Sequence, residues 1–157
     1  SSDISVIKNQ YNLKKYILLF PFCSPHLTIK KWPYYNDLIN LISNKFGDEY
    51  KILTAPGPKE IIDAQEINAL IVLDNGKSLD VSQLTSLIID SSFVVANDTG
   101  PAHISAHVGA RGLTLFGTHT TAYKVSIERK NFKAIEVSDL NNLSAEKVFE
   151  RLYNSLS

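Results

Sequence analysis

The 157-residue chain is long enough for one ordinary domain with a self-sufficient core, and no second domain is expected. Its 16 basic and 16 acidic side chains balance, which excludes an overall field that would draw the protein to nucleic acid or anionic lipid. The single cysteine, Cys23, excludes an intrachain disulfide and a cysteine-only metal site, so we expect a cytoplasmic protein.

Two further features of the sequence concern membrane insertion and processing. No apolar run approaches the roughly 20 residues of a membrane span, and Ser1-Ser2-Asp3 is not the start of a secretory signal. Methionine is absent, even at position 1, which suggests a processed product or a fragment of a longer protein.

In chain order, a polar lead-in over residues 1–15 precedes a domain over residues 16–157. The run Tyr16–Phe20 is continuously apolar and is stopped by Pro21, as is typical of a strand buried on both faces. Pro33 then stands where a first helical residue should, and apolar residues follow at helical spacing up to Gly47. This strand-then-helix unit recurs along the whole chain.

The remaining predicted elements continue that alternation. Strands are expected at residues 50–53, 69–73, 93–96, 113–116 and 132–137. Helices are expected at 59–67, from Asp80 with a Gln83 capping box, at 101–108, and from Ser144. Six strands joined by short helical crossovers predict an α/β, Rossmann-like, doubly wound and mostly parallel sheet.

Two loops are expected to form the ligand site. In a doubly wound sheet with strand order 3-2-1-4-5-6, the connections leaving strands 1 and 4 diverge and open a crevice at the carboxyl edge. These connections are residues 21–32 and 97–103, which also carry the least ordinary local sequences of the chain. Topology and local chemistry therefore indicate the same place.

The second of these loops has the character of a phosphate site. Thr99 and Gly100 fall at a helix cap, where backbone N–H groups are unpaired and Gly100 has no side chain to keep an anion away. His103, in the first helical turn, could also reach a phosphate, whereas the Asp98 carboxylate suits sugar hydroxyls better. The alternative is an ordinary capped turn with a surface aspartate. His103 and His107 have the spacing of a zinc pair, but no third ligand is evident, so no metal is predicted.

The first loop offers Ser24, Lys30 and Lys31 ahead of Trp32, which we expect to be a core residue. A lysine here could reach across the crevice to a phosphate, although the residues alone do not choose between the two lysines. Glu60, in Gly57-Pro58-Lys59-Glu60, follows the second strand at the same edge, where turn chemistry is an equally good explanation.

These residues resemble the lipopolysaccharide heptosyltransferases, the family 9 glycosyltransferases that use ADP-heptose. The resemblance rests on four segments, which in chain order are Lys30-Lys31-Trp32-Pro33, Gly57-Pro58-Lys59-Glu60, Asp98-Thr99-Gly100-Pro101-Ala102-His103 and Leu115-Phe116-Gly117. Two positions depart from the family pattern, namely Pro21-Phe22-Cys23 where Pro-Gly-Ala is usual and Thr118 where proline is usual.

The resemblance implies the C-terminal, donor-binding half of a GT-B glycosyltransferase. It would place five residues near the diphosphate, Asp98 near the heptose and Glu60 near the ribose or the sugar; the five are Ser24, Lys30, Thr99, Gly100 and His103. The catalytic carboxylate would lie in an N-terminal acceptor-binding domain, so no catalytic residue is assigned in this chain.

The implied reaction transfers heptose from ADP-heptose to the lipopolysaccharide inner core by an inverting displacement, without a metal or other cofactor. The chain by itself would bind ADP or ADP-heptose but not transfer the sugar, and the full enzyme would contact its acceptor through the other domain, in the cytoplasm and peripheral to the inner membrane. Two alternatives stay open: another GT-B enzyme using a UDP-sugar, including the 2-epimerases, and a stand-alone nucleotide-binding module.

Overall fold

Strands and helices alternate along the computed structural model, which describes residues 3–23, 31–117 and 127–157. The strands are β1 (Tyr16–Phe20), β2 (Lys51–Thr54), β3 (Leu70–Ile71), β4 (Phe93–Asn97), β5 (Gly112–Phe116) and β6 (Phe132–Glu136). The helices are α1 (Ile4–Tyr11), α2 (Tyr35–Phe46), α3 (Ile61–Ala64), α4 (Val81–Ile89), α5 (Gly100–His107) and α7 (Ala145–Leu156), with the short 3-10 helices η2 (Gly47–Glu49) and η4 (Leu140–Asn142).

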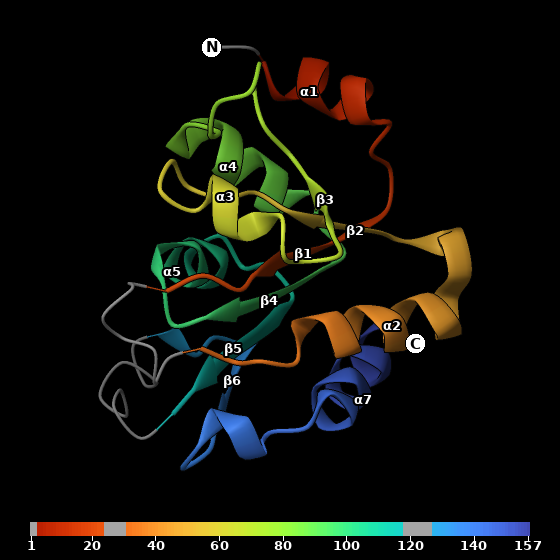
Figure 1. The fold of residues 1–157 in the computed structure, drawn as a ribbon, viewed down its shortest axis with the longest axis vertical. Helices are drawn as coiled ribbons and strands as arrows, with labels where there is room; N and C mark the ends of the chain where they lie inside the picture. The colour runs from red at the N-terminus through yellow and green to blue at the C-terminus, as the bar shows by residue number, and fades with distance from the viewer. Residues whose placement is uncertain (1–2, 24–30, 118–126) are drawn as a thin grey trace.

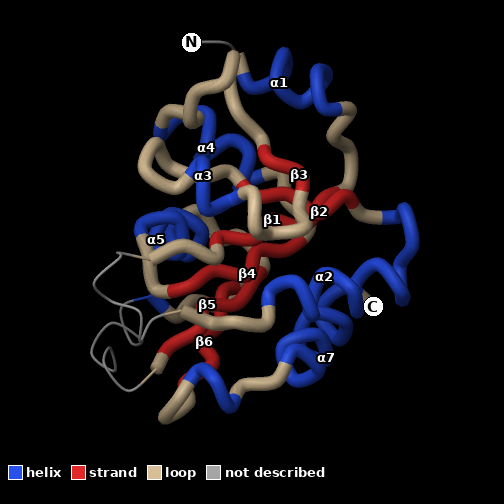
Figure 2. Tube along the Cα trace, in the orientation of Figure 1, coloured by secondary structure: helices blue, strands red, loops and turns tan. Residues whose placement is uncertain are grey.

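All six strands form one parallel sheet in the order β3-β2-β1-β4-β5-β6, which confirms the predicted doubly wound topology (Figure 2). In the centre, Phe20 of β1 is in register with Ala96 of β4. These two strands are buried along their whole length, as predicted from the apolar runs Tyr16–Phe20 and Phe93–Ala96. Their carboxyl ends therefore open side by side at one edge of the sheet.

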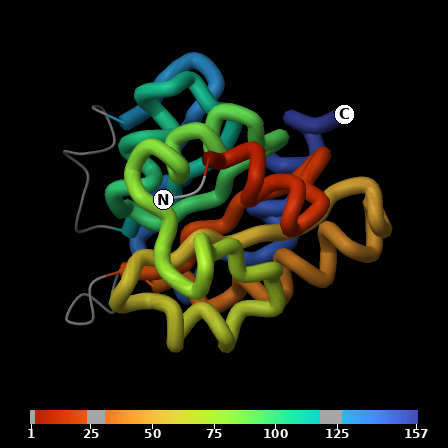
Figure 3. The backbone as a smooth tube through the Cα atoms, turned by 90° about the horizontal axis from the view of Figure 1, so that it is seen from above, coloured from red at the N-terminus to blue at the C-terminus, as the bar shows by residue number. Residues whose placement is uncertain are grey.

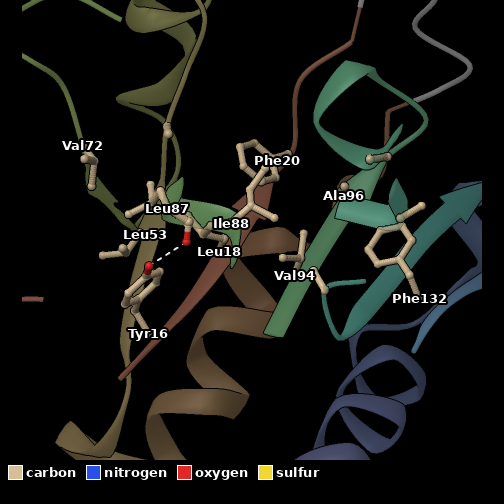
Figure 4. Close-up of a cluster of buried hydrophobic side chains, with 14 of the residues drawn as sticks. Tyr16, Leu18, Phe20, Leu53, Val72, Leu87, Ile88, Val94, Ala96 and Phe132 are labelled. Atoms are coloured by element: carbon tan, nitrogen blue, oxygen red, sulfur yellow. Dashed lines mark hydrogen bonds between the residues drawn. The ribbon is translucent and has the colours of Figure 1, made fainter. Parts of the chain in front are cut away.

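The helices lie in two layers on either side of the sheet (Figure 1). One face packs against α1, α4 and α5, and its core includes Leu18, Leu87 and Ala106. The other face packs against α2 and α7, and its core includes Leu19 and Val148. Figure 4 shows part of the first core, where Tyr16 donates a hydrogen bond to the Leu87 carbonyl oxygen.

Gly112 allows β5 to come close to β4. A Cβ atom at this position would lie 2.3 Å from the carbonyl oxygen of Val94 and 2.9 Å from Cε1 of Phe132. Neither neighbour has room to withdraw, because β4 and β6 flank β5 in the sheet. Glycine here is required by the packing of the strands.

Residues 3–15 pack against the domain and include a helix, unlike the lead-in expected from the sequence. Asp3 caps α1 by accepting a hydrogen bond from the Ser5 backbone N–H, and Ile7 is buried in the core. Lys8 pairs with Asp90 at 2.8 Å, which ties α1 to the end of α4. Figure 3 looks down on this end of the molecule, where α1 lies in front of the sheet.

Two predicted elements are shorter than expected, and the predicted caps are present. The segment after β2 forms only α3, because Gln65, Glu66 and Ile67 continue as tight i to i−3 turns. β3 is also shorter than predicted: only Leu70 and Ile71 pair with β2, at the edge of the sheet. The Asp80–Gln83 capping box and the Ser144 cap are confirmed.

Within the described residues, no helix is long and apolar enough to cross a membrane.

Candidate functional site

The crevice predicted at the switch point lies where β1 ends at Phe20 and β4 ends at Asn97. These strands are neighbours in the sheet, while the chain leaves them toward α2 and α5, which cover opposite faces. Such a divergence is where doubly wound sheets bind their ligands. The described residues around it come from the end of β1, the start of α2, and the β4–α5 connection.

Asn97 ties the two strand ends and α2 together. Its side-chain Oδ1 accepts a 2.8 Å hydrogen bond from the hydroxyl of Tyr35, and its Nδ2 donates a 3.1 Å bond to the carbonyl oxygen of Pro21. Asn97 is completely buried and Tyr35 almost completely so. Burial raises the pKa of the Tyr35 hydroxyl well above its ordinary value, with a smaller contribution from the charge of Cys23, so the tyrosine stays a proton donor.

The start of α5 presents backbone donors at the crevice. Thr99, in extended conformation, caps the helix: its carbonyl oxygen accepts bonds from the backbone N–H groups of Ala102 and His103 at 3.1 and 3.3 Å. Its hydroxyl donates a 3.2 Å bond to the Asn97 carbonyl oxygen. In the part of the chain that the structure describes, the N–H groups of Thr99 and Gly100 have no acceptor, as predicted for an anion-binding helix start.

Gly100 is a glycine that the fold itself does not require. Its φ is not positive, and a Cβ atom built on it would have no heavy atom of the described chain within 4 Å. It is also solvent-exposed. Nothing in the described chain therefore requires glycine at this position.

Asp98 and His103 lie on either side of these donors. The Asp98 side chain is only 6% exposed, whereas that of His103 is 47% exposed, and Asp98 Oδ1 is 4.0 Å from His103 Nε2. A buried carboxylate beside an exposed imidazole gives the site an acceptor for hydroxyl groups and a donor for an anion.

The other predicted residues differ in what the structure says of them. Ser24 and Lys30 lie outside the described residues, and Lys31 is exposed. Glu60 is at the carboxyl edge after β2, and its Oε1 accepts a 2.8 Å bond from the Gly57 backbone N–H, so one carboxylate oxygen is used in the turn. Trp32 is 3% exposed and packs edge-on against Tyr35, which confirms it as a core residue.

Two hollows and no metal-ligand cluster accompany the site in the described residues. Within residues 3–23, 31–117 and 127–157, no three His, Cys, Asp or Glu side chains are grouped to hold a metal ion. A hollow of about 430 Å³ beside α5 is lined by His103, His107 and Arg129 among others. A groove of about 450 Å³ between α2 and the start of α7 contains Asp37 and Glu146 and, among its described lining residues, no cation, so it suits a diphosphate poorly.

The sequence did not reveal Tyr35 and Asn97 as partners. Tyr35 reads as an apolar helix residue, and Asn97 as the first residue of a loop, and they are 62 positions apart. The available signal was a polar residue at the end of an otherwise apolar strand, because a buried amide needs partners.

A doubly wound parallel sheet with a helix start at its switch point is a Rossmann-like α/β domain, an architecture that binds ligands at that edge of the sheet. The chain belongs to glycosyltransferase family 9 (heptosyltransferase), whose family model matches residues 3–151. No curated protein matches the chain.

Solved structures show the same fold. Escherichia coli ADP-heptose LPS heptosyltransferase II matches with a TM-score of 0.75 and 21% identity, covering 99% of this chain and 52% of its own. E. coli heptosyltransferase WaaC with ADP matches with a TM-score of 0.74 and 20% identity, covering 99% of this chain and 50% of its own. Methanocaldococcus jannaschii UDP-GlcNAc 2-epimerase, in complex with UDP-GlcNAc and UDP, matches with a TM-score of 0.68 and 12% identity. The match covers 100% of this chain and 42% of the epimerase chain.

The chain thus spans about half the length of the heptosyltransferases that it matches. Its fold is that of the C-terminal half of a GT-B glycosyltransferase, as the sequence resemblance implies.

Proposed function

We propose that this domain binds ADP-heptose and serves as the donor-binding half of a glycosyltransferase that transfers heptose to the lipopolysaccharide inner core. The observation that carries the proposal is Gly100, an exposed glycine at the start of a helix at the switch point. Its N–H group has no acceptor among the described residues, and its Cβ position meets no atom that would require glycine. Membership of glycosyltransferase family 9 supports the reaction class. The structure of WaaC with ADP supports the choice of nucleotide.

In this proposal the diphosphate lies against the start of α5. The N–H groups of Thr99 and Gly100 donate to phosphate oxygens, and the exposed His103 imidazole adds a further donor. Asp98 accepts hydrogen bonds from heptose hydroxyls, and Ser24 and Lys30 approach the diphosphate from the facing loop. Glu60, whose carboxylate is oriented by Gly57, contacts the ribose or the sugar.

The proposed chemistry is an inverting displacement in which an acceptor hydroxyl attacks the anomeric carbon while ADP leaves. Negative charge then builds on the leaving diphosphate, and donors fixed in advance stabilise it without a metal ion. The catalytic carboxylate and the acceptor site belong to the other domain of the enzyme, so this domain alone binds the donor without transferring the sugar. The full enzyme would act in the cytoplasm, peripheral to the inner membrane.

Calorimetric titration with ADP, UDP, GDP and CDP tests the proposal. ADP should bind most tightly, and Gly100→Ala should weaken ADP binding roughly tenfold, because a methyl group keeps the phosphate from the backbone. The Gly100→Ala variant should be at least as stable as the wild type, because its added Cβ atom meets no other atom and alanine lowers the entropy of the unfolded chain. An unchanged affinity for ADP in Gly100→Ala would place the site elsewhere.

Two further variants test the rest of the site. Lys30→Ala removes the proposed charge and should cost about 1–3 kcal/mol of binding free energy. Thr99→Pro removes one backbone donor and the hydroxyl bond to the Asn97 carbonyl oxygen, and it changes the extended φ of −149°, so it should cost at least as much. Lys31→Ala is the matched control for Lys30→Ala, because Lys31 is the adjacent exposed lysine. Equal losses in the two lysine variants would contradict a specific role for Lys30.

A UDP-sugar is the second candidate donor. The fold match to the UDP-GlcNAc 2-epimerase of M. jannaschii favours it, since the same half-chain architecture occurs there in complex with UDP. Tighter binding of UDP than of ADP in the titration would select this alternative.

A further inference from the structure

We infer that Tyr35 and Asn97 are positioning residues that set the geometry of the nucleotide site through a buried hydrogen-bond lock. The inference rests on the proposed function, because it assumes that the Thr99–Gly100 segment binds the diphosphate. The lock consists of the Tyr35 hydroxyl, the Asn97 side-chain amide and the Pro21 carbonyl oxygen. Neither Tyr35 nor Asn97 needs to touch the ligand in order to act.

The first step concerns the orientation of Asn97. Its Oδ1 and Nδ2 each have a partner from a different element, α2 on one side and the end of β1 on the other. Asn97 is 0% and Tyr35 2% exposed, so water does not compete for these groups. Under such burial a lost partner is not replaced, and the amide would be left unsatisfied.

The second step connects the lock to the backbone donors. The Asn97 carbonyl oxygen accepts the hydrogen bond from the Thr99 hydroxyl at 3.2 Å. The residue whose side chain is held from two sides therefore also fixes the cap that directs the Thr99 and Gly100 N–H groups into the crevice. A rotation or shift of Asn97 would move the cap and the buried Asp98 that follows it.

The third step concerns the facing loop. Residues 22–34 connect β1 to α2, and the lock holds this connection at both ends, at Pro21 and at Tyr35. The Trp32 ring packs edge-on against the Tyr35 ring with centroids 4.9 Å apart, which keeps the α2 end in place. One amide group thus relates the two sides of the crevice to each other.

A buried amide that merely satisfies its own hydrogen bonds would look similar, so the test needs a control of equal structural cost. Tyr16 provides it. Its hydroxyl is also buried and donates a short bond, 2.6 Å, to the Leu87 carbonyl oxygen, but it lies at the start of β1, the end away from the crevice (Figure 4). Tyr35→Phe and Tyr16→Phe remove the same group from comparable surroundings.

The experiment measures ADP affinity by calorimetry and stability by urea unfolding for the wild type and both variants. Both should lose stability, whereas only Tyr35→Phe should bind ADP more weakly, by roughly tenfold. Titrations are repeated in an excluded osmolyte such as sucrose, which keeps both variants fully folded. A weakened affinity that persists in the osmolyte supports positioning, and one that returns to the wild-type value there overturns it.

Asn97→Ala and the double variant Tyr35→Phe/Asn97→Ala complete the cycle. If the lock acts as one unit, the double variant should lose no more ADP affinity than Asn97→Ala alone. Additive losses would mean that the two residues act independently and would overturn the lock. Failure of the wild type to bind ADP would instead overturn the proposed function, and wild-type affinity in Tyr35→Phe would overturn only this inference.

Discussion

The indole N–H of Trp32 donates a 2.7 Å hydrogen bond to the carbonyl oxygen of Leu143, 111 positions further along the chain. It joins the entry into α2 to the segment that leads into α7. Both residues are buried, and the two helices pack on the same face of the sheet. Trp32, in the segment Lys30-Lys31-Trp32-Pro33, is therefore a structural residue, and this role does not depend on ligand binding by Lys30 or Lys31.

Replacing Trp32 with phenylalanine should destabilise the domain by about 1–3 kcal/mol, because the buried Leu143 carbonyl oxygen loses its donor. Urea unfolding monitored by circular dichroism measures this loss. Tryptophan fluorescence cannot be used, because Trp32 is the only tryptophan and is absent from the variant. Stability equal to the wild type would show that the indole hydrogen bond contributes nothing net.

Gly112→Ala should be among the more damaging single-methyl changes in the domain. The new Cβ would meet the Val94 carbonyl oxygen at 2.3 Å, and relieving that overlap forces β5 away from β4, at a cost of about 1–3 kcal/mol or more. Chemical denaturation compared with Gly100→Ala provides the control, because the same substitution meets no atom there. Similar denaturation midpoints for the two variants would contradict this account.

The order of the sheet was predictable because local patterns determine it. Short apolar runs separated by helical repeats leave few topologies, and right-handed crossovers with short connections favour the doubly wound one. The capping box of α4 was predictable for the same reason, since Asp80 and Gln83 are only three residues apart. The helix start at Thr99 and Gly100 also followed from neighbouring residues alone.

The features that the sequence did not predict depend on contacts between distant segments. α1 lies in the segment predicted as a polar lead-in. Only Ile7 along it is buried, and its place is set by packing against the sheet and by the Lys8–Asp90 pair. The Tyr35–Asn97 contact has the same character. The roles of Ser24, Lys30 and Glu60 in binding stay predictions that the titrations above will test.

Thr114→Val should stabilise the domain by about 1 kcal/mol, because a buried hydroxyl without a partner costs desolvation free energy. Thr114 is 0% exposed, and its Oγ1 has no hydrogen-bond partner among the described residues. Valine has nearly the same shape and suits a strand. Thr85→Val is the control, since the Thr85 hydroxyl donates a 2.7 Å bond to the Val81 carbonyl oxygen. A destabilised Thr114→Val would reveal a partner for that hydroxyl.

Alkaline pH should destabilise the domain through two of its buried tyrosines, Tyr16 and Tyr35. Burial raises the pKa of Tyr16, with a smaller contribution from the charge of Asp90, and burial likewise raises that of Tyr35, both from an ordinary value of 10.0. Above about pH 10 the unfolded chain has lost these protons while the folded chain keeps them. The unfolded state then binds fewer protons, so the free energy of unfolding falls as the pH rises.

Each buried tyrosine should contribute a slope approaching about 1.4 kcal/mol per pH unit between its unfolded and folded pKa. Urea midpoints measured from about pH 8 to about pH 11 give this slope, which should be smaller in Tyr16→Phe than in the wild type because one titrating group is gone. Below about pH 9 the two proteins should show parallel, flat profiles, offset by the lost hydrogen bond to Leu87. An alkaline slope unchanged by Tyr16→Phe would mean that Tyr16 ionises as readily in the folded protein as in the unfolded chain.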